Sequence, residues 1–105
     1  GGGRTMASIA SVLASKTKTK VPLLRVFVKV VTFSDDCADA LLKDPTGEIR
    51  ATIHGGLVEA EGDGLACGSS LVMRRLTVFH SFNGRDRSLV VTPNNLVRCY
   101  PPTRG

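Results

Sequence analysis

The sequence has few of the residues that build metal or catalytic sites: three cysteines, two histidines and no tryptophan. Cys37, Cys67 and Cys99 lie about thirty residues apart, without a CxxC pair or a histidine at zinc-ligand spacing. This pattern excludes a zinc site and is typical of reduced thiols in the cytosol or nucleus. His54 and His80 lack a motif-placed nucleophile or paired carboxylates, and no GxxxxGKS-type phosphate loop is present. We therefore expect no enzyme activity, no cofactor, no metal and no small-molecule substrate.

Long apolar runs are missing as well. No segment approaches the roughly 20 apolar residues that span a bilayer, so we expect no membrane partner. The nearest approach to an acidic metal cluster is Asp35, Asp36 and Asp39, which lack the glycine and distal glutamate of a calcium loop. These aspartates predict a polar turn.

Acidic residues are absent from the first 20 positions. The net charge is +5, and Arg4, Lys16, Lys18 and Lys20 supply four of those charges. A basic arm of this kind binds phosphates through counterion release, although a solvated terminus has the same composition. We divide the chain into an arm or linker (1–20), a folded domain (21–100) and a disordered tail (101–105). The arm has a short helix as an alternative.

That helix would form over the "MASIASVLASK" segment. Met6, Ile9, Ala10 and Leu13 recur there at helical spacing and predict one apolar face. A helix so short is marginal alone. Whether the arm packs on the folded domain stays open.

From Val21 the apolar period changes to two, which is typical of half-buried strands. In "VPLLRVFVKVVTF" the pattern places one set of side chains inward (Leu24, Val26, Val28, Val30) and the other outward (Arg25, Phe27, Lys29, Val31). "ADALLKD" predicts a second strand, and the turn Asp44-Pro45-Thr46-Gly47 joins it to a third, "EIRATIH". In this third strand Ile49, Ala51 and Ile53 should face inward, and Glu48, Arg50, Thr52 and His54 outward.

The second half begins with a break in the alternation. "GGLVEAEGDGLACGSS" suits a short helix, and "SLVMRRLTVFHSF" a fourth strand with a bulge at Arg74-Arg75. Asn83-Gly84 predicts a hairpin that returns as "RSLVV". Pro93 ends that strand, and "NLVRCY" extends or re-enters it.

Three strands, a helical connector and a two-stranded hairpin form the order of an OB-fold. We therefore predict an all-β protein: a five-stranded OB-fold barrel with a short helical connector between strands three and four. An SH3-like barrel or a split sandwich has a similar strand count but usually lacks the connector.

Two stretches carry a resemblance to known families. "LKDPTGEIRATIH" resembles the hairpin of the second and third strands in the single-strand DNA-binding domains of the replication protein A large subunit. In that pattern the arginine of "EIRAT" contacts the DNA strand, and an aromatic residue four positions later stacks on a base. The matching positions are Arg50 and His54, where histidine replaces the larger aromatic. A second stacking residue in the last hairpin corresponds loosely to Phe82.

A wider set of segments, "VPLLRVFVKVVT", "KDPTGEI", "TIH" and "VTPNNLVRCYPP", is similar to the OB domain of the homologous recombination OB-fold family over roughly residues 15–102. That resemblance implies a nuclear factor of homologous recombination and interstrand crosslink repair. It also implies a partner, a mini-chromosome-maintenance-type hexameric helicase that the factor recruits and stimulates.

From register and resemblance together we predict a nucleic-acid-binding face that holds single-stranded DNA weakly, mainly by phosphate contacts. Its candidate residues are Arg25, Phe27, Lys29, Arg50, His54, Phe82, Arg85 and Arg87. The alternative is an ordinary solvated sheet face, because exposed lysine and arginine are common. A register slip of one residue would turn the face inward.

The competing functional hypothesis is a protein-interaction OB domain that docks on the helicase and does not itself bind DNA. The small number of aromatic residues favours it, because we expect Phe33 and Phe79 to be needed elsewhere in the fold. Few rings would then remain for stacking on bases.

Overall fold

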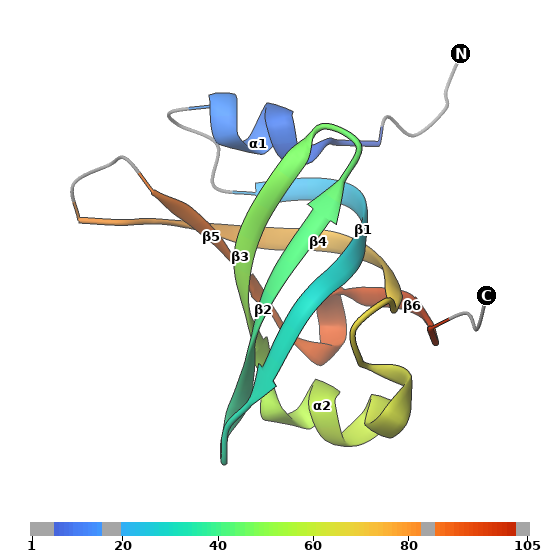
Figure 1. Ribbon diagram of the computed structural model, residues 1–105. Coiled ribbons are helices and arrows are strands. Elements are labelled where there is room, and N and C mark those ends of the chain that lie inside the picture. The colour runs from blue at the N-terminus through green and yellow to red at the C-terminus, as the bar shows by residue number, and fades with distance from the viewer. Residues whose placement is uncertain (1–5, 16–19, 83–85, 103–105) are drawn as a thin grey trace.

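The computed structural model describes residues 6–15, 20–82 and 86–102 (Figure 1). Its elements are α1 (Ile9–Ala14), β1 (Lys20–Phe33), β2 (Cys37–Asp44), β3 (Gly47–His54), α2 (Gly55–Glu61), β4 (Ser70–His80), β5 (Arg87–Val91) and β6 (Leu96–Tyr100). Single turns of 3₁₀ helix, η1 (Gly62–Gly64) and η2 (Pro93–Asn95), follow α2 and β5. None of the helices in these ranges is long and apolar enough to cross a membrane.

The strands close into a barrel in the order β1-β2-β3-β5-β4, and a β1–β4 pairing completes the circle. Only the β3–β5 pairing is parallel among the strand pairs described. The helix α2 lies between β3 and β4 along the chain and at one end of the barrel (Figure 1). This architecture is the five-stranded OB-fold barrel that the sequence predicts. The segment "NLVRCY" forms an additional sixth strand, β6, which pairs with β4.

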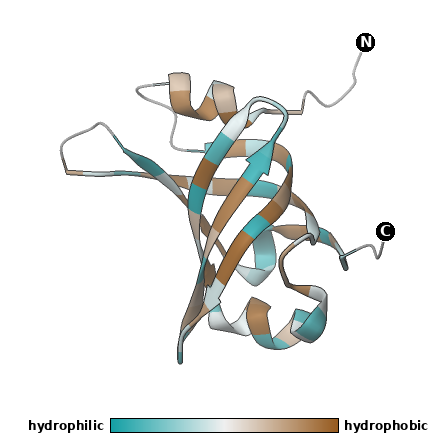
Figure 2. Ribbon diagram, viewed as in Figure 1, coloured by the Kyte–Doolittle hydropathy of each residue, from teal (hydrophilic) through white to brown (hydrophobic). Residues whose placement is uncertain are grey.

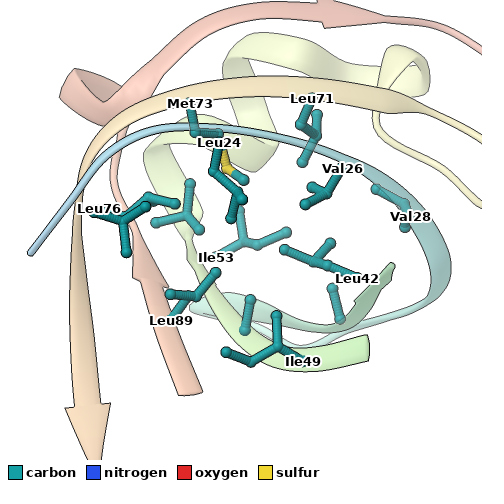
Figure 3. Packing of buried hydrophobic residues seen from close by; sticks show 14 of the residues in the cluster. Leu24, Val26, Val28, Leu42, Ile49, Ile53, Leu71, Met73, Leu76 and Leu89 are labelled. Atoms are coloured by element: carbon teal, nitrogen blue, oxygen red, sulfur yellow. The ribbon is translucent and has the colours of Figure 1, made fainter. Parts of the chain in front are cut away.

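The barrel core is aliphatic. Hydrophobic and hydrophilic residues alternate along the strands (Figure 2), and the inward set packs as one cluster that includes Leu24, Leu42, Ile53, Met73 and Leu89 (Figure 3). In β3 the predicted alternation is confirmed by burial at every second position. All five aromatic residues stay at the surface, with exposed fractions of 43% for Phe27, 53% for Phe33, 60% for Phe79, 110% for Phe82 and 44% for Tyr100. The expectation that Phe33 and Phe79 serve the fold is therefore wrong, since aliphatic side chains fill the interior.

A β-bulge changes the facing of β1 halfway along its length. The register with β2 shifts between Val28 and Val30. The extra residue, Lys29, reverses the alternation that follows it. Val30 is therefore 47% exposed, whereas Val31 packs against the core. The prediction had these two valines the other way round, because period-two counting does not anticipate a bulge.

The predicted irregularity at Arg74-Arg75 is present as a kink in β4. Arg75 adopts a left-handed backbone with φ of 52°. The β1 residue opposite it in the register is Pro22, which has no N–H to give to the ladder. The side-chain amide of Asn95 donates to the carbonyls of Arg74 and Arg75, at 3.0 Å in each case. At this kink β4 changes neighbour from β6 to β5.

The helix α1 packs on the barrel at the β2–β3 turn. A carboxylate oxygen of Asp44 accepts a hydrogen bond from the backbone N–H of Ile9 at 2.8 Å, and the Thr46 hydroxyl accepts one from Ala10 at 2.9 Å. Hydrogen bonds to Thr46, Ile9 and Gly47 outweigh the opposing effect of partial burial and hold the pKa of Asp44 below its ordinary value. The turn thus caps the helix as well as joining two strands.

The buried face of α1 differs from the predicted one. Ile9 and Val12 are buried in the barrel core, whereas Met6 and Leu13 are 47% and 39% exposed. The apolar face of Met6, Ile9, Ala10 and Leu13 is therefore wrong except for Ile9. Among the described residues of the arm (6–15 and 20), Ile9 and Val12 belong to the core, so this part of the arm packs on the barrel.

Candidate nucleic-acid interface

One outward-facing row of side chains crosses all five barrel strands. Val30 of β1 lies opposite Leu41 of β2, and Leu41 lies opposite Arg50 of β3. Arg50 is paired on its other side with Ser88 of β5, and Ser88 with Phe79 of β4. Because directly opposed residues project to the same side, the row is continuous. Four strand spacings make it about 19 Å long.

This row forms the floor of two adjoining surface hollows, which share Leu41, Glu48, Arg50 and Ser88. We call the following lining residues the groove: Val30, Thr32, Asp39, Leu41, Glu48, Arg50, Thr52, Phe79, Asp86, Arg87 and Ser88. Leu13 of α1 also lines one hollow, so the docked helix forms part of its side. The groove runs across the strands and is open along its length, a shape that suits an extended ligand.

The groove is balanced in charge rather than strongly basic. Arg50 and Arg87 line the groove together with three acidic residues, Asp39, Glu48 and Asp86. Lys29 lies at the rim, where its ammonium group pairs with Glu48 at 2.7 Å. Within the described part of the chain no hydrogen bond or ion pair holds the Arg50 side chain. Arg50 is therefore the cation that is best placed in the groove to meet a phosphate.

Arg87 has a different role in the groove. Its Nε donates to the backbone carbonyl of Ser15 at 2.8 Å. Ser15 follows directly after α1, so this bond ties the end of the helix to β5. Arg87 thus joins the α1 side of the groove to its floor.

Exposed rings lie at the β4 end of the groove. Phe79 lines it on β4, and Phe82 follows β4 at the beginning of the last hairpin. Phe33, at the end of β1, is paired with the buried Ala38 and lines neither hollow. An unburied ring has no packing role to lose and presents a face on which a base can stack. Phe79, which the sequence analysis assigned to the fold, is therefore available for stacking on a base.

The predicted site residues divide between the groove and other surfaces. Arg50 and Arg87 line the groove, Lys29 is at its rim, and Phe82 is exposed beyond one end. Arg85 lies outside the described residues, as does the Asn83-Gly84 tip, although the β4–β5 pairing has the antiparallel register of a hairpin.

Arg25 and Phe27 do not share a face with Arg50. Arg25 pairs with Val72 of β4 and not with β2, so it lies around the barrel from the groove. Beyond the bulge, Val30 and Thr32 are the β1 residues that line the groove. The prediction of a single face failed here because the barrel closes and the bulge changes the facing of β1.

His54 also departs from the predicted arrangement. Its Nδ1 accepts a hydrogen bond from the backbone N–H of Gly56 at 2.9 Å, which caps the N-terminus of α2. The ring lines neither hollow. The beginning of a helix directly after His54 was the available signal for this capping role.

Nothing in the described residues resembles a catalytic or metal centre. They hold no group of three or more metal-ligating side chains, and the three cysteines are free. Burial, together with the neighbouring carboxylate of Glu61, raises the pKa of the Cys99 thiol to about 11. A thiol of that pKa is protonated at neutral pH and is a poor nucleophile.

Residues 19–103 match the model of a protein family described as homologous recombination OB-fold protein. The chain belongs to this family. The human family member is 42% identical over 88 residues, and the mouse member is 41% identical over 88 residues. The match covers 84% of the chain but only 13% of the human protein and 14% of the mouse protein.

Solved structures outside the family share the fold. An OB domain from Methanosarcina mazei superposes with a TM-score of 0.67 at 19% identity, covering 95% of this chain and 85% of that one. A murine DNA-binding protein bound to double-stranded DNA gives a TM-score of 0.71 at 18% identity, covering 97% and 50%. Schizosaccharomyces pombe Pot1pC, solved with single-stranded DNA, gives 0.62 at 10% identity, covering 87% and 78%. At these identities the likeness supports the OB-fold alone.

Proposed function

We propose that this domain is a non-catalytic module of a homologous recombination factor and that it binds single-stranded DNA weakly in the groove. The observation that carries the proposal is the row from Val30 to Phe79, which has an exposed ring at its end. At its centre lies Arg50, which has no hydrogen-bond or ion-pair partner among the described residues. Arg50 would hold a phosphate, and Phe79 and Phe82 would stack on bases. Because these contacts read no base edges, binding would discriminate little between sequences.

Family membership supports a wider role. We propose that the full-length protein works in the nucleus, in homologous recombination and interstrand crosslink repair, where it recruits and stimulates a mini-chromosome-maintenance-type helicase. The domain would supply the contact with DNA. Since the match covers only 13% of the human relative, the helicase contact has ample room elsewhere in a protein of that length.

A second candidate function is docking of the barrel on the helicase without DNA contact. The charge balance of the groove favours it, because Asp39, Glu48 and Asp86 would repel a phosphate backbone. On that hypothesis, substitutions in the groove would abolish association with the helicase. DNA binding by other parts of the full-length protein would stay intact.

The test is fluorescence anisotropy with a labelled oligo-dT of about 5 nucleotides, which is near the lower end of OB-fold site sizes. Arg50→Ala should weaken binding about 5-fold and lower the slope of log K against log salt by about 0.7, as expected for one lost phosphate contact on a single strand. Arg98→Ala is the matched control, because it removes the same charge from a strand outside the groove. Equal affinities for wild type and Arg50→Ala would reject the groove as the DNA site. The helicase arm is tested separately by co-purification of wild type and Arg50→Ala with the hexamer.

A further inference from the structure

Acidic and basic residues are distributed unevenly among the strands. All nine acidic residues lie outside β1, β4 and β6: Asp35, Asp36, Asp39, Asp44, Glu48, Glu59, Glu61, Asp63 and Asp86. In the sheet β4 is paired with both β1 and β6. The lysine and arginine residues of these three strands are Lys20, Arg25, Lys29, Arg74, Arg75 and Arg98. The surface formed by β1, β4 and β6 is therefore positive, in contrast to the balanced groove.

Two paired rows organise this surface. Arg25 of β1 lies opposite Val72 of β4, which lies opposite Arg98 of β6. In the adjacent row Phe27 lies opposite Ser70, and Ser70 opposite Tyr100. We call Arg25, Phe27, Val72, Arg98 and Tyr100 the wall. The two arginines are about 10 Å apart across two strand spacings, and a row of rings runs beside them.

The wall residues are available to a ligand. Phe27 and Tyr100 are 43% and 44% exposed, and both arginines are exposed. The Arg98 guanidinium carbon lies 5.9 Å from the centroid of the Tyr100 ring, an arrangement that holds charge and ring together. Ser70, between the two rings, is buried, and among the described residues its hydroxyl has no hydrogen-bond partner.

The wall is continuous with the groove across β1. Phe27 pairs with Ser70 on one side and with Lys43 of β2 on the other, and Lys43 pairs with Glu48 of the groove. Because Lys29 forms an ion pair with Glu48, Lys43 gives the surface between the groove and the wall a net positive charge. A polyanion that leaves the groove over β2 and β1 passes Lys43 and Phe27 before it reaches Arg25.

We propose that the wall is a second contact site for single-stranded nucleic acid, which takes the continuation of a strand whose first part lies in the groove. The inference rests on the proposed function of the groove. Arg25 and Arg98 bind phosphates, and Phe27 and Tyr100 offer faces to bases. Charge complementarity fits any polyanion, but continuity with the groove and the alternation of cations with rings favour a nucleic acid over an acidic polypeptide.

The test compares labelled oligo-dT of about 5 and about 15 nucleotides, because the wall should be reached only by the longer strand. In Arg25→Ala/Arg98→Ala, affinity for the long strand should fall about 10-fold or more, and its salt slope should fall by about 1.4. Affinity for the short strand should not change. Lys20→Ala is the control: it removes one charge from β1 some distance along the strand from Arg25, and should leave both affinities nearly unchanged. Unchanged melting temperatures establish that the variants are folded.

The outcomes separate the two proposals. If the double variant binds the long strand like wild type while Arg50→Ala weakens both strands, the wall inference is overturned and the groove stands. If Arg50→Ala leaves both strands unaffected, the groove proposal fails. If the double variant loses binding to poly-glutamate but keeps its affinity for the long strand, the wall takes an acidic polypeptide and the inference is likewise overturned.

Discussion

At the scale of single residues, two side chains of the groove, Phe79 and Arg50, have few contacts with the rest of the fold. Phe79 is 60% exposed in a strand whose inward residues, Leu76 and Val78, are aliphatic. Arg50 likewise has no partner within the described ranges. Such positions are free to serve a ligand, because changing them removes little packing.

Phe79→Ala should therefore separate binding from stability. We expect affinity for a short oligo-dT to fall about 5-fold, corresponding to about 1 kcal/mol of lost stacking. The free energy of unfolding should change by no more than about 0.5 kcal/mol. Phe27→Ala, which removes a ring from the wall, is the matched control for the short strand. A loss of stability without a loss of affinity would show that Phe79 serves the fold.

The backbone of Arg75 offers a second prediction at this scale. A left-handed φ of 52° costs free energy for any residue with a Cβ, and glycine relieves it. Arg75→Gly should be neutral or stabilise the protein by up to about 1 kcal/mol in chemical denaturation, despite the flexibility of glycine in the unfolded chain. The same change at the neighbouring Arg74, whose φ is not positive, should destabilise by about 0.5 to 1 kcal/mol. Equal losses of stability at both positions would contradict a strained left-handed backbone at Arg75.

At the scale of elements, the β2–β3 turn and α1 act as a unit through Asp44. Its carboxylate binds the turn at Thr46 and Gly47 and the helix at Ile9. Asp44→Ala should cost about 1 to 2 kcal/mol, the loss expected for a capping side chain. The measurement is urea unfolding followed by circular dichroism. Asp35→Ala, in the β1–β2 turn, is the control.

The pH dependence of this unit has a definite sign. Because the pKa of Asp44 is lowered on folding, its contribution to stability is fully present above the unfolded value of 3.8. The contribution is lost as pH falls through the lower folded pKa. Wild type should therefore lose stability more steeply than Asp44→Asn below about pH 4. Identical acid profiles would exclude this linkage.

Much of the element order could be predicted because its signals are local. Ile49, Ala51 and Ile53 alternate with polar neighbours, and the Asp44-Pro45-Thr46-Gly47 turn specifies its own geometry. The outward direction of Val30 could not be predicted, because the bulge arises from how β1 pairs with β2. The groove could therefore be predicted only in part. Arg50 was predicted from local alternation, whereas the positions of Phe79 and Ser88 depend on the long-range β4–β5 and β3–β5 registers.

At the scale of the whole molecule, the folded unit extends beyond the five strands. Ala7 bridges to Leu24 of β1, and Ile9 and Val12 enter the core from α1. The sequence could not indicate this, since a six-residue helix has little stability without the surface that it covers. Removing the basic arm would therefore remove part of the core together with its charges.

Substitutions within α1 measure this contribution. Ile9→Ala should destabilise the domain by about 2 to 4 kcal/mol, because it leaves a cavity at a fully buried position. Leu13→Ala, on the exposed side of the same helix, should cost less than about 1 kcal/mol. Thermal unfolding checks both. Equal, small effects would mean that α1 is not part of the cooperative unit.

The surface position of every aromatic residue determines what spectroscopy can detect in this domain. The chain has no tryptophan, and its single tyrosine, Tyr100, is on the wall rather than in the core. Tyrosine emission should hence respond weakly to unfolding and directly to whatever covers β6. Tyr100 would thus be a poor fluorescent probe of unfolding, but a long DNA strand bound to the wall would quench its emission.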